Sequence, residues 1–178
     1  MKVKAFQMAS GESYSILLGD DGMPLPYQNL FVTLHYRNES KASNTRYRVF
    51  EHLCFLEEIC QLEKIDLIER CKTGDFLTNK DFENIKKHSK LKVESFREMV
   101  ARHELSNIVS IKKNKLETAR ANVVVNPEGD ISPHTTYNRL TVFAKFIGWL
   151  EEELFPSKNS TAEVELKKIR GDKFGTSD

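Results

Sequence analysis

Two long segments of the sequence repeat apolar residues with the period of an α-helix. In residues 43–62 the apolar positions recur at three- and four-residue spacing, as in Val49, Phe50 and Leu53, and residues 132–155 show the same pattern. Side chains at this spacing share one stripe of a helix, and that stripe is buried in a globular protein. The two segments therefore predict a mainly α fold with its core between two long helices.

Each of these helices is expected to begin on polar residues. Ser43 or Asn44 can cap the first helix by accepting a backbone N–H, and Ser132 can do so for the second. Pro133 suits the first helical turn, where its missing N–H costs nothing. The caps predict where the two helices start.

Turn residues and shorter periodic runs predict the rest of the chain. Residues 2–8 and 13–18 form a hairpin, and residues 26–36 form a short helix with Leu30, Phe31 and Leu34 on one face. A further helix opens at Thr78, with Asp81 completing a capping box. Residues 88–118 form two helical pieces, residues 121–125 a short strand and residues 161–170 a helix of alternating charge. The predicted organisation is a hairpin segment (1–24), a helical domain (25–156) with an insertion at about 88–130, and a linker or tail (157–178).

The charge balance limits what the chain can bind. Its 27 Lys and Arg against 26 Asp and Glu give a net charge of +1, which excludes a uniformly basic nucleic-acid coat. Any affinity for DNA must come from where the charges lie, and residues 80–117 hold ten Lys or Arg against six Asp or Glu. No segment has the roughly 20 apolar residues of a membrane helix or the apolar run of a secretory signal. We expect a cytoplasmic protein that does not bind a membrane.

Catalytic and metal-binding patterns are missing from the sequence. The three cysteines, Cys54, Cys60 and Cys71, lack metal-ligand spacing and are expected to be reduced, buried thiols. The histidines are scattered, and neither a glycine-rich phosphate loop nor an HExxH or GxSxG motif is present. We therefore predict no catalytic residue, no metal site and no cofactor, and we disfavour a small-molecule enzyme.

The starts of the two long helices carry the pattern most typical of DNA binding. A helix N-terminus attracts phosphate, nearby Lys and Arg add salt-sensitive attraction, and Asn and Arg can reach base edges. The predicted DNA-binding residues are Lys41, Asn44, Thr45, Arg46 and Arg48 at the first helix and His134, Thr135, Asn138, Arg139 and Lys145 at the second. Ordinary caps with solvated charges would explain any single one of these residues equally well.

Several of these residues also carry a resemblance to a known family. Residues 14–69 resemble the N-terminal part of phage-type integrases of the tyrosine recombinase family, with a strand, an Asp-Asp-Gly turn, an Asn29-Leu30-Phe31 helix and a Ser43-Asn44-Thr45 helix start. Residues 131–150, with Asn138-Arg139-Leu140, are similar to the last helix of that family's core-binding domain. The resemblance covers most of residues 14–155, with residues 88–130 as a subfamily insertion.

The resemblance implies a SAM-like bundle of about four core helices that clamps one face of a recombination site. The two long helices would cross adjacent major grooves of double-stranded DNA, and other recombinase protomers would be partners in the synaptic complex. The family's strand cleavage and rejoining belong to a separate domain, whose Arg-His-x-x-Arg-type box does not occur here, so we expect a fragment without catalytic activity. The alternative is a helical protein-interaction module with Phe146 and Trp149 facing outward.

Overall fold

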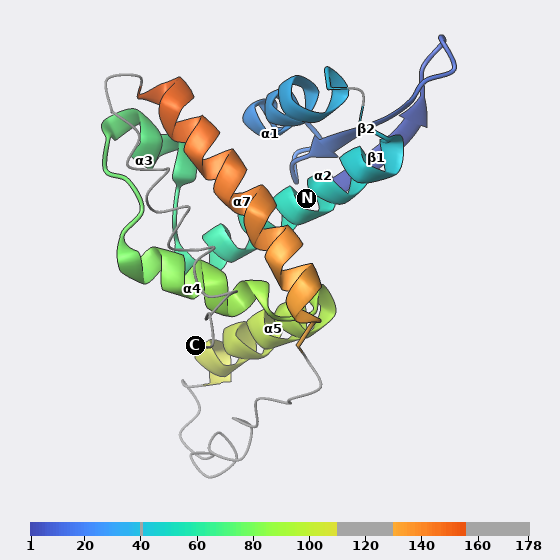
Figure 1. Cartoon of the computed structure of the whole chain (residues 1–178). Helices are drawn as coiled ribbons and strands as arrows, with labels where there is room; N and C mark the ends of the chain where they lie inside the picture. Colours follow the sequence, from blue (N-terminus) through green and yellow to red (C-terminus); the bar gives the residue numbers. More distant parts are fainter. Residues whose placement is uncertain (40, 110–129, 156–178) are drawn as a thin grey trace, which may run out of the picture.

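The computed structural model describes residues 1–39, 41–109 and 130–155, and within them the protein is mainly helical with one small antiparallel hairpin (Figure 1). The predicted fold class is confirmed. In chain order the elements are β1 (Lys2–Gln7), β2 (Ser13–Leu18), α1 (Pro26–Val32), the π-helical turn η1 (Thr33–Arg37), α2 (Ser43–Glu63), α3 (Leu67–Thr73), α4 (Asn79–Ser89), α5 (Val93–Val109) and α7 (Pro133–Leu154). The strand predicted at 121–125, the helix predicted at 161–170 and the tail at 157–178 lie outside the described residues.

The hairpin is held on the helical part by α1 and α2. Strands β1 and β2 pair in register from Lys2 opposite Leu18 to Gln7 opposite Ser13. On the other side of β2, the side chain of Asn29 in α1 accepts a hydrogen bond from the backbone N–H of Leu17 (3.0 Å) and donates one to its carbonyl (2.9 Å). An amide side chain thus extends the sheet to the first helix.

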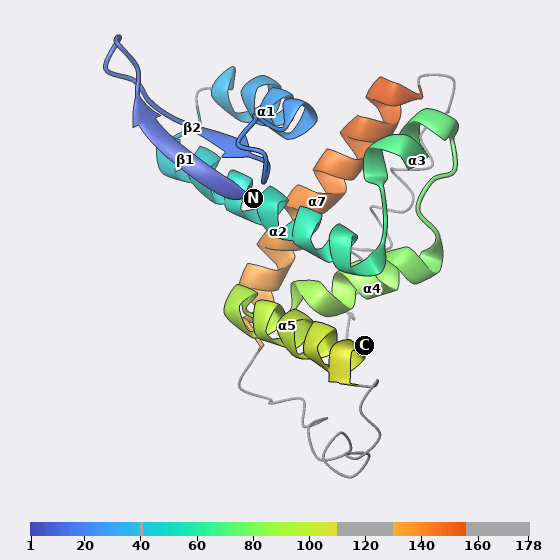
Figure 2. The same ribbon diagram turned by 180° about the vertical axis from the view of Figure 1, so that it is seen from behind.

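The two long helices were predicted nearly to the residue, and they cross at the centre of the molecule (Figures 1 and 2). Ser132 caps α7 and accepts a hydrogen bond from the N–H of Thr135, as predicted. The predicted cap of α2 is wrong, because Ala42 occupies the N-cap and no side chain caps the helix. Ser43 is instead its first helical residue.

The core between these helices is rich in aromatic residues. Phe31 of α1 is 1% exposed and packs edge-on against Phe146 of α7, with ring centroids 5.3 Å apart. Leu30 and Leu34 were predicted to lie on the same helix face as Phe31, but they are 43% and 41% exposed while Phe31 is buried. The side chains that α1 buries are those of Gln28, Phe31 and Val32.

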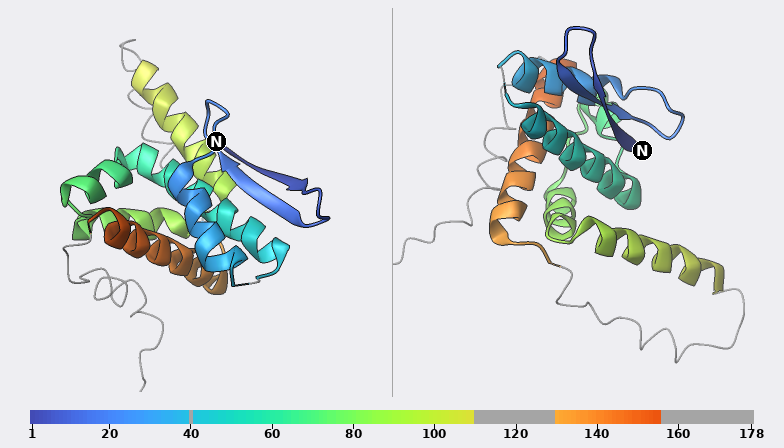
Figure 3. Two further views of the ribbon diagram at one scale, coloured as in Figure 1. Left: turned by 90° about the horizontal axis from the view of Figure 1, so that it is seen from above. Right: turned by 90° about the vertical axis from the view of Figure 1, so that its right-hand side faces the viewer.

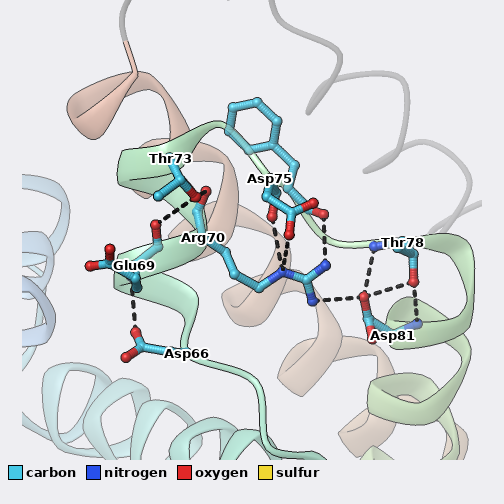
Figure 4. A network of polar contacts seen from close by, with 8 residues as sticks. Asp66, Glu69, Arg70, Thr73, Asp75, Thr78 and Asp81 are labelled. Carbon is cyan, nitrogen blue, oxygen red and sulfur yellow. Dashed lines mark hydrogen bonds and ion pairs between the residues drawn. The ribbon is translucent and has the colours of Figure 1, made fainter.

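Helices α3 and α4 are joined by a polar network around Arg70 (Figure 4). Its guanidinium donates hydrogen bonds to the Asp81 carboxylate (2.9 Å) and to the carbonyls of Asp75 (2.9 Å) and Phe76 (3.1 Å). Asp81 also closes the predicted capping box with Thr78 at the start of α4. The network fixes the connection that places α4 below α2.

The described part of the segment predicted as an insertion is built into the core. Phe96 of α5 is 1% exposed and packs against Phe55 of α2, with ring centroids 5.1 Å apart. Arg97 forms a bidentate ion pair with Glu58 of α2 (2.6 and 3.0 Å). Figure 3 shows α5 running outward from this anchored end. The first turns of α5 are therefore a structural part of the domain.

Candidate nucleic-acid interface

In Figure 1 the first turn of α2 lies at the upper right and the first turn of α7 lies lower, right of centre, and Figure 2 shows both left of centre from behind. Neither first turn contains an acidic residue. The unpaired N–H groups and the positive dipole end of each helix are therefore not neutralised by a carboxylate of the same turn. This arrangement favours anions on that side of the protein.

Most of the predicted DNA-binding side chains lie on the surface, and all of these except Lys145, which is near the middle of α7, are close to the two helix starts. Lys41, Asn44, Thr45, Arg48, His134, Asn138 and Lys145 are exposed, and Thr135 is half-buried. Lys41 is within 3.7 Å of Glu39, so part of its charge is matched locally. The other two predicted residues, Arg46 and Arg139, are placed differently.

Arg46 is buried, with 8% of its surface exposed, and it joins α2 to the hairpin. Its guanidinium donates a hydrogen bond to the carbonyl of Ser13 (2.7 Å) and pairs with the Glu12 carboxylate (3.3 Å). Hydrogen bonds from Arg37 and the charges of Arg37 and Arg46 hold the pKa of Glu12 below its usual value. The prediction that Arg46 contacts DNA is corrected, since the side chain is buried and its Nη2 is held by Ser13 and Glu12.

Arg139 is also buried, with 5% of its surface exposed. One guanidinium nitrogen donates hydrogen bonds to the carbonyls of Ser89 (2.7 Å) and Leu91 (2.8 Å), and the guanidinium lies 4.4 Å from the ring centroid of Phe55. Burial lowers the pKa of Arg139 to about 10, which still leaves the side chain charged at neutral pH. This arginine holds the turn after α4 against α7, so its predicted role as a direct DNA ligand is corrected too.

The helical phase was the signal that could have identified both buried arginines. Arg46 precedes Val49, Phe50 and Leu53 by three, four and seven residues, so it lies on the same stripe as the core. Arg48 lies off the corresponding stripe of its helix and is exposed. The charge of a side chain alone does not distinguish a buried arginine from an exposed one.

The half-buried His52 of α2 is affected by the charge of a basic residue from each of the two long helices. Its pKa is lowered to about 4, first by burial and then by the positive charges of Arg139 and Arg48. The imidazole is therefore neutral at physiological pH and adds no charge to the surface.

The described residues contain no group of three or more His, Cys, Asp or Glu side chains placed to hold a metal ion. Cys54, Cys60 and Cys71 are free and buried, as predicted, and burial raises the pKa of Cys54 to about 11. Such a thiol is protonated and a poor nucleophile. Within the described ranges no helix has the length and apolar character required to span a membrane.

Comparisons with protein-family models, with curated proteins and with solved structures found no match. The candidate interface consists of two helix starts whose first turns contain no acidic residue, with exposed basic and amide side chains near them.

Proposed function

We propose that this chain is the DNA-clamping, core-binding region of a site-specific tyrosine recombinase of the phage integrase type. Its SAM-like bundle holds one face of the recombination site in double-stranded DNA, and strand cleavage and rejoining are carried out by a catalytic domain outside this sequence. Other protomers of the same recombinase are its partners in the synaptic complex. Because the other half of the clamp is missing, the isolated chain binds DNA weakly and with little sequence preference.

The observation that carries the proposal is the common side taken by the starts of α2 and α7. Arg48 is exposed in the second turn of α2 and supplies salt-sensitive attraction to phosphates, and Lys145, exposed near the middle of α7, adds to it farther along that helix. Asn138, exposed in the second turn of α7, can reach a base edge. The buried Arg46 and Arg139 support the surface from inside and do not contact DNA. Of the ten residues predicted to contact DNA, we therefore retain the eight that are not buried.

A protein-interaction module built on Phe146 and Trp149 has little support. Phe146 is 1% exposed, and the indole of Trp149 packs against Phe31 with ring centroids 5.5 Å apart. Since these side chains are engaged in the core, they do not form an outward docking face.

The salt dependence of DNA binding tests the proposal. Fluorescence anisotropy with a labelled duplex is measured over a range of salt concentrations for the wild type and for the double variant Arg48→Gln/Lys145→Gln. Each lost phosphate contact lowers the slope of log K against log salt by roughly 0.9, so the slope should fall by about 2. The matched control is Lys72→Gln/Lys80→Gln, which removes two exposed charges from α3 and the start of α4, on the opposite side.

The control variant should keep the wild-type slope. Equal losses of slope in the two variants would show that binding follows net charge and not this surface. A wild-type chain that binds no duplex at low salt would overturn the proposed function itself.

A further inference from the structure

We infer that the turn between α4 and α5 is a third element of the DNA-contacting surface and that the buried Arg139 is its positioning residue. The inference rests on the proposed function, which it extends to a contact outside the two helix starts. The element consists of residues 89–92, with Lys90 and Lys92 as the phosphate-contacting side chains.

The turn is fastened to the start of α7 by backbone interactions on both sides of Leu91. Arg139 donates hydrogen bonds to the carbonyls of Ser89 and Leu91 from one side. From the other side, the N–H of Ile131 donates to the carbonyl of Lys90 (2.8 Å), and Leu91 forms a β-bridge with Asp130. The turn is therefore held by the segment that leads into α7 and by the second turn of that helix.

This fastening turns the two lysines toward solvent. Leu91 is half-buried and packs on the core, whereas Lys90 and Lys92, its neighbours on each side, are both exposed. Lys90 ends α4 with helical backbone angles and Lys92 follows the bridge that Leu91 makes, so the chain leaves both lysine side chains at the surface on either side of the anchored leucine. Lys87, three residues before Lys90, is exposed as well and extends the basic surface along the end of α4.

Two exposed carboxylates belong to the same region and bear on its charge. Glu94 interacts electrostatically with Arg139, so the buried guanidinium offsets its charge. Asp130 forms its bridge to Leu91 through the backbone, and its exposed side chain is free to be changed. With three exposed lysines in the region, phosphate is the ligand class that this surface favours.

The first experiment separates the lysines from the helix-start surface. Anisotropy over a range of salt concentrations is measured for Lys90→Gln/Lys92→Gln beside the control Lys72→Gln/Lys80→Gln. The slope of log K against log salt should fall by about 2 in the first variant and stay unchanged in the control. Asp130→Asn, which removes a repelling charge, should bind more tightly than the wild type.

The second experiment tests Arg139 as a positioning residue with Arg139→Lys, which keeps the positive charge but loses the planar fork. Binding is measured at a temperature where the variant is fully folded by circular dichroism. Its affinity should fall several-fold while its salt slope stays near the wild-type value, because Lys90 and Lys92 are still present. Faster amide exchange at Ile131 should accompany the loss.

The possible results distinguish a failure of the proposed contact at residues 89–92 from a failure of the proposed DNA-binding function. If the wild type binds and Lys90→Gln/Lys92→Gln behaves like the control, the turn does not contact DNA and the inference fails alone. If folded Arg139→Lys binds with wild-type affinity, Arg139 has a purely structural role and its positioning role is refuted. If the wild type does not bind DNA, both the inference and the proposed function fail.

Discussion

The neutral imidazole of His52 should make the stability of this fold sensitive to mild acid. Burial, together with the positive charges of Arg139 and Arg48, lowers the pKa of His52 in the folded protein to about 4, against an ordinary value near 6.5. Above pH 6.5 the ring is neutral in both states and the shift has no effect on stability. Below pH 6.5 the unfolded chain takes up a proton that the folded protein does not, so stability is lost as the pH falls from about 6.5 to about 4.

The size of the effect follows from the difference between the two pKa values. A difference of about 2.5 corresponds to about 3 kcal/mol when the loss is complete, because one pKa unit is worth about 1.36 kcal/mol. Between pH 7 and pH 5 the linkage relation gives about 2 kcal/mol. His52 keeps some solvent exposure, and screening reduces the expected loss to between about 1 and 2 kcal/mol.

Urea denaturation at pH 7 and pH 5 measures this loss. The variant His52→Gln removes the titrating group, so its free energy of unfolding should fall less between the two pH values than that of the wild type, by about 1–2 kcal/mol. The control His134→Gln removes an exposed histidine and should follow the wild type. Parallel losses in wild type and His52→Gln would refute the assignment of a depressed pKa to this ring.

Two substitutions test the internal contacts by thermal or urea denaturation. Arg139→Ala should destabilise the protein by about 3–5 kcal/mol, because two charge-assisted hydrogen bonds are lost, one to a buried carbonyl and one to a half-buried carbonyl. Substitution of its exposed neighbour, Asn138→Ala, should cost about 0.5 kcal/mol or less, and similar losses in the two variants would contradict the buried role of Arg139. Gly74→Ala should cost more than about 1 kcal/mol, because the residue has a φ of +75° and a Cβ would lie 3.1 Å from the ring of Phe155. Gly22→Ala shares the positive φ but meets nothing within 4 Å, so equal costs in the two glycine variants would show that crowding by Phe155 is unimportant.

The elements that sequence reasoning located well are those whose signals are local. Helical periodicity, the Ser132 cap and the Thr78 capping box each involve residues within one or two turns, and the structure has all three. The α2 start was misjudged because Ser43 and Asn44 have the right chemistry for a cap, while the chain turns into the helix one residue earlier, at Ala42. A side chain that can cap does not by itself fix the residue at which a helix begins.

Local sequence patterns could not predict which segments far apart in the chain pack against each other. Leu30, Phe31 and Leu34 have helical spacing, yet the aromatic core formed with α7 takes in only Phe31. Phe96 was assigned to an insertion, but it fills the space beside Phe55, about forty residues earlier in the chain. Neither outcome could be derived without knowing which helices pack together.

The two arginines show how local and distant information combine in the candidate interface. A basic residue near the start of a helix has the right charge for DNA, and for that reason Arg46, in the first turn of α2, and Arg139, in the second turn of α7, were assigned to the interface. Their helical phase places them on the buried stripe, yet phase alone does not explain how a guanidinium can be stable there. It is stable because each finds carbonyls from a segment far along the chain, Ser13 for Arg46 and Ser89 for Arg139.

These internal hydrogen bonds also limit which side chains are available to bind DNA. A guanidinium whose hydrogen bonds are used by the fold would have to break them to bind a phosphate, and the protein would lose the stability that they supply. A basic residue off the buried stripe, such as Arg48 or Lys145, carries no such cost. The phosphate-binding surface of this domain is therefore expected on the exposed phase of α2 and α7 and on the turn that Arg139 holds, and variants there should weaken DNA binding without unfolding the protein.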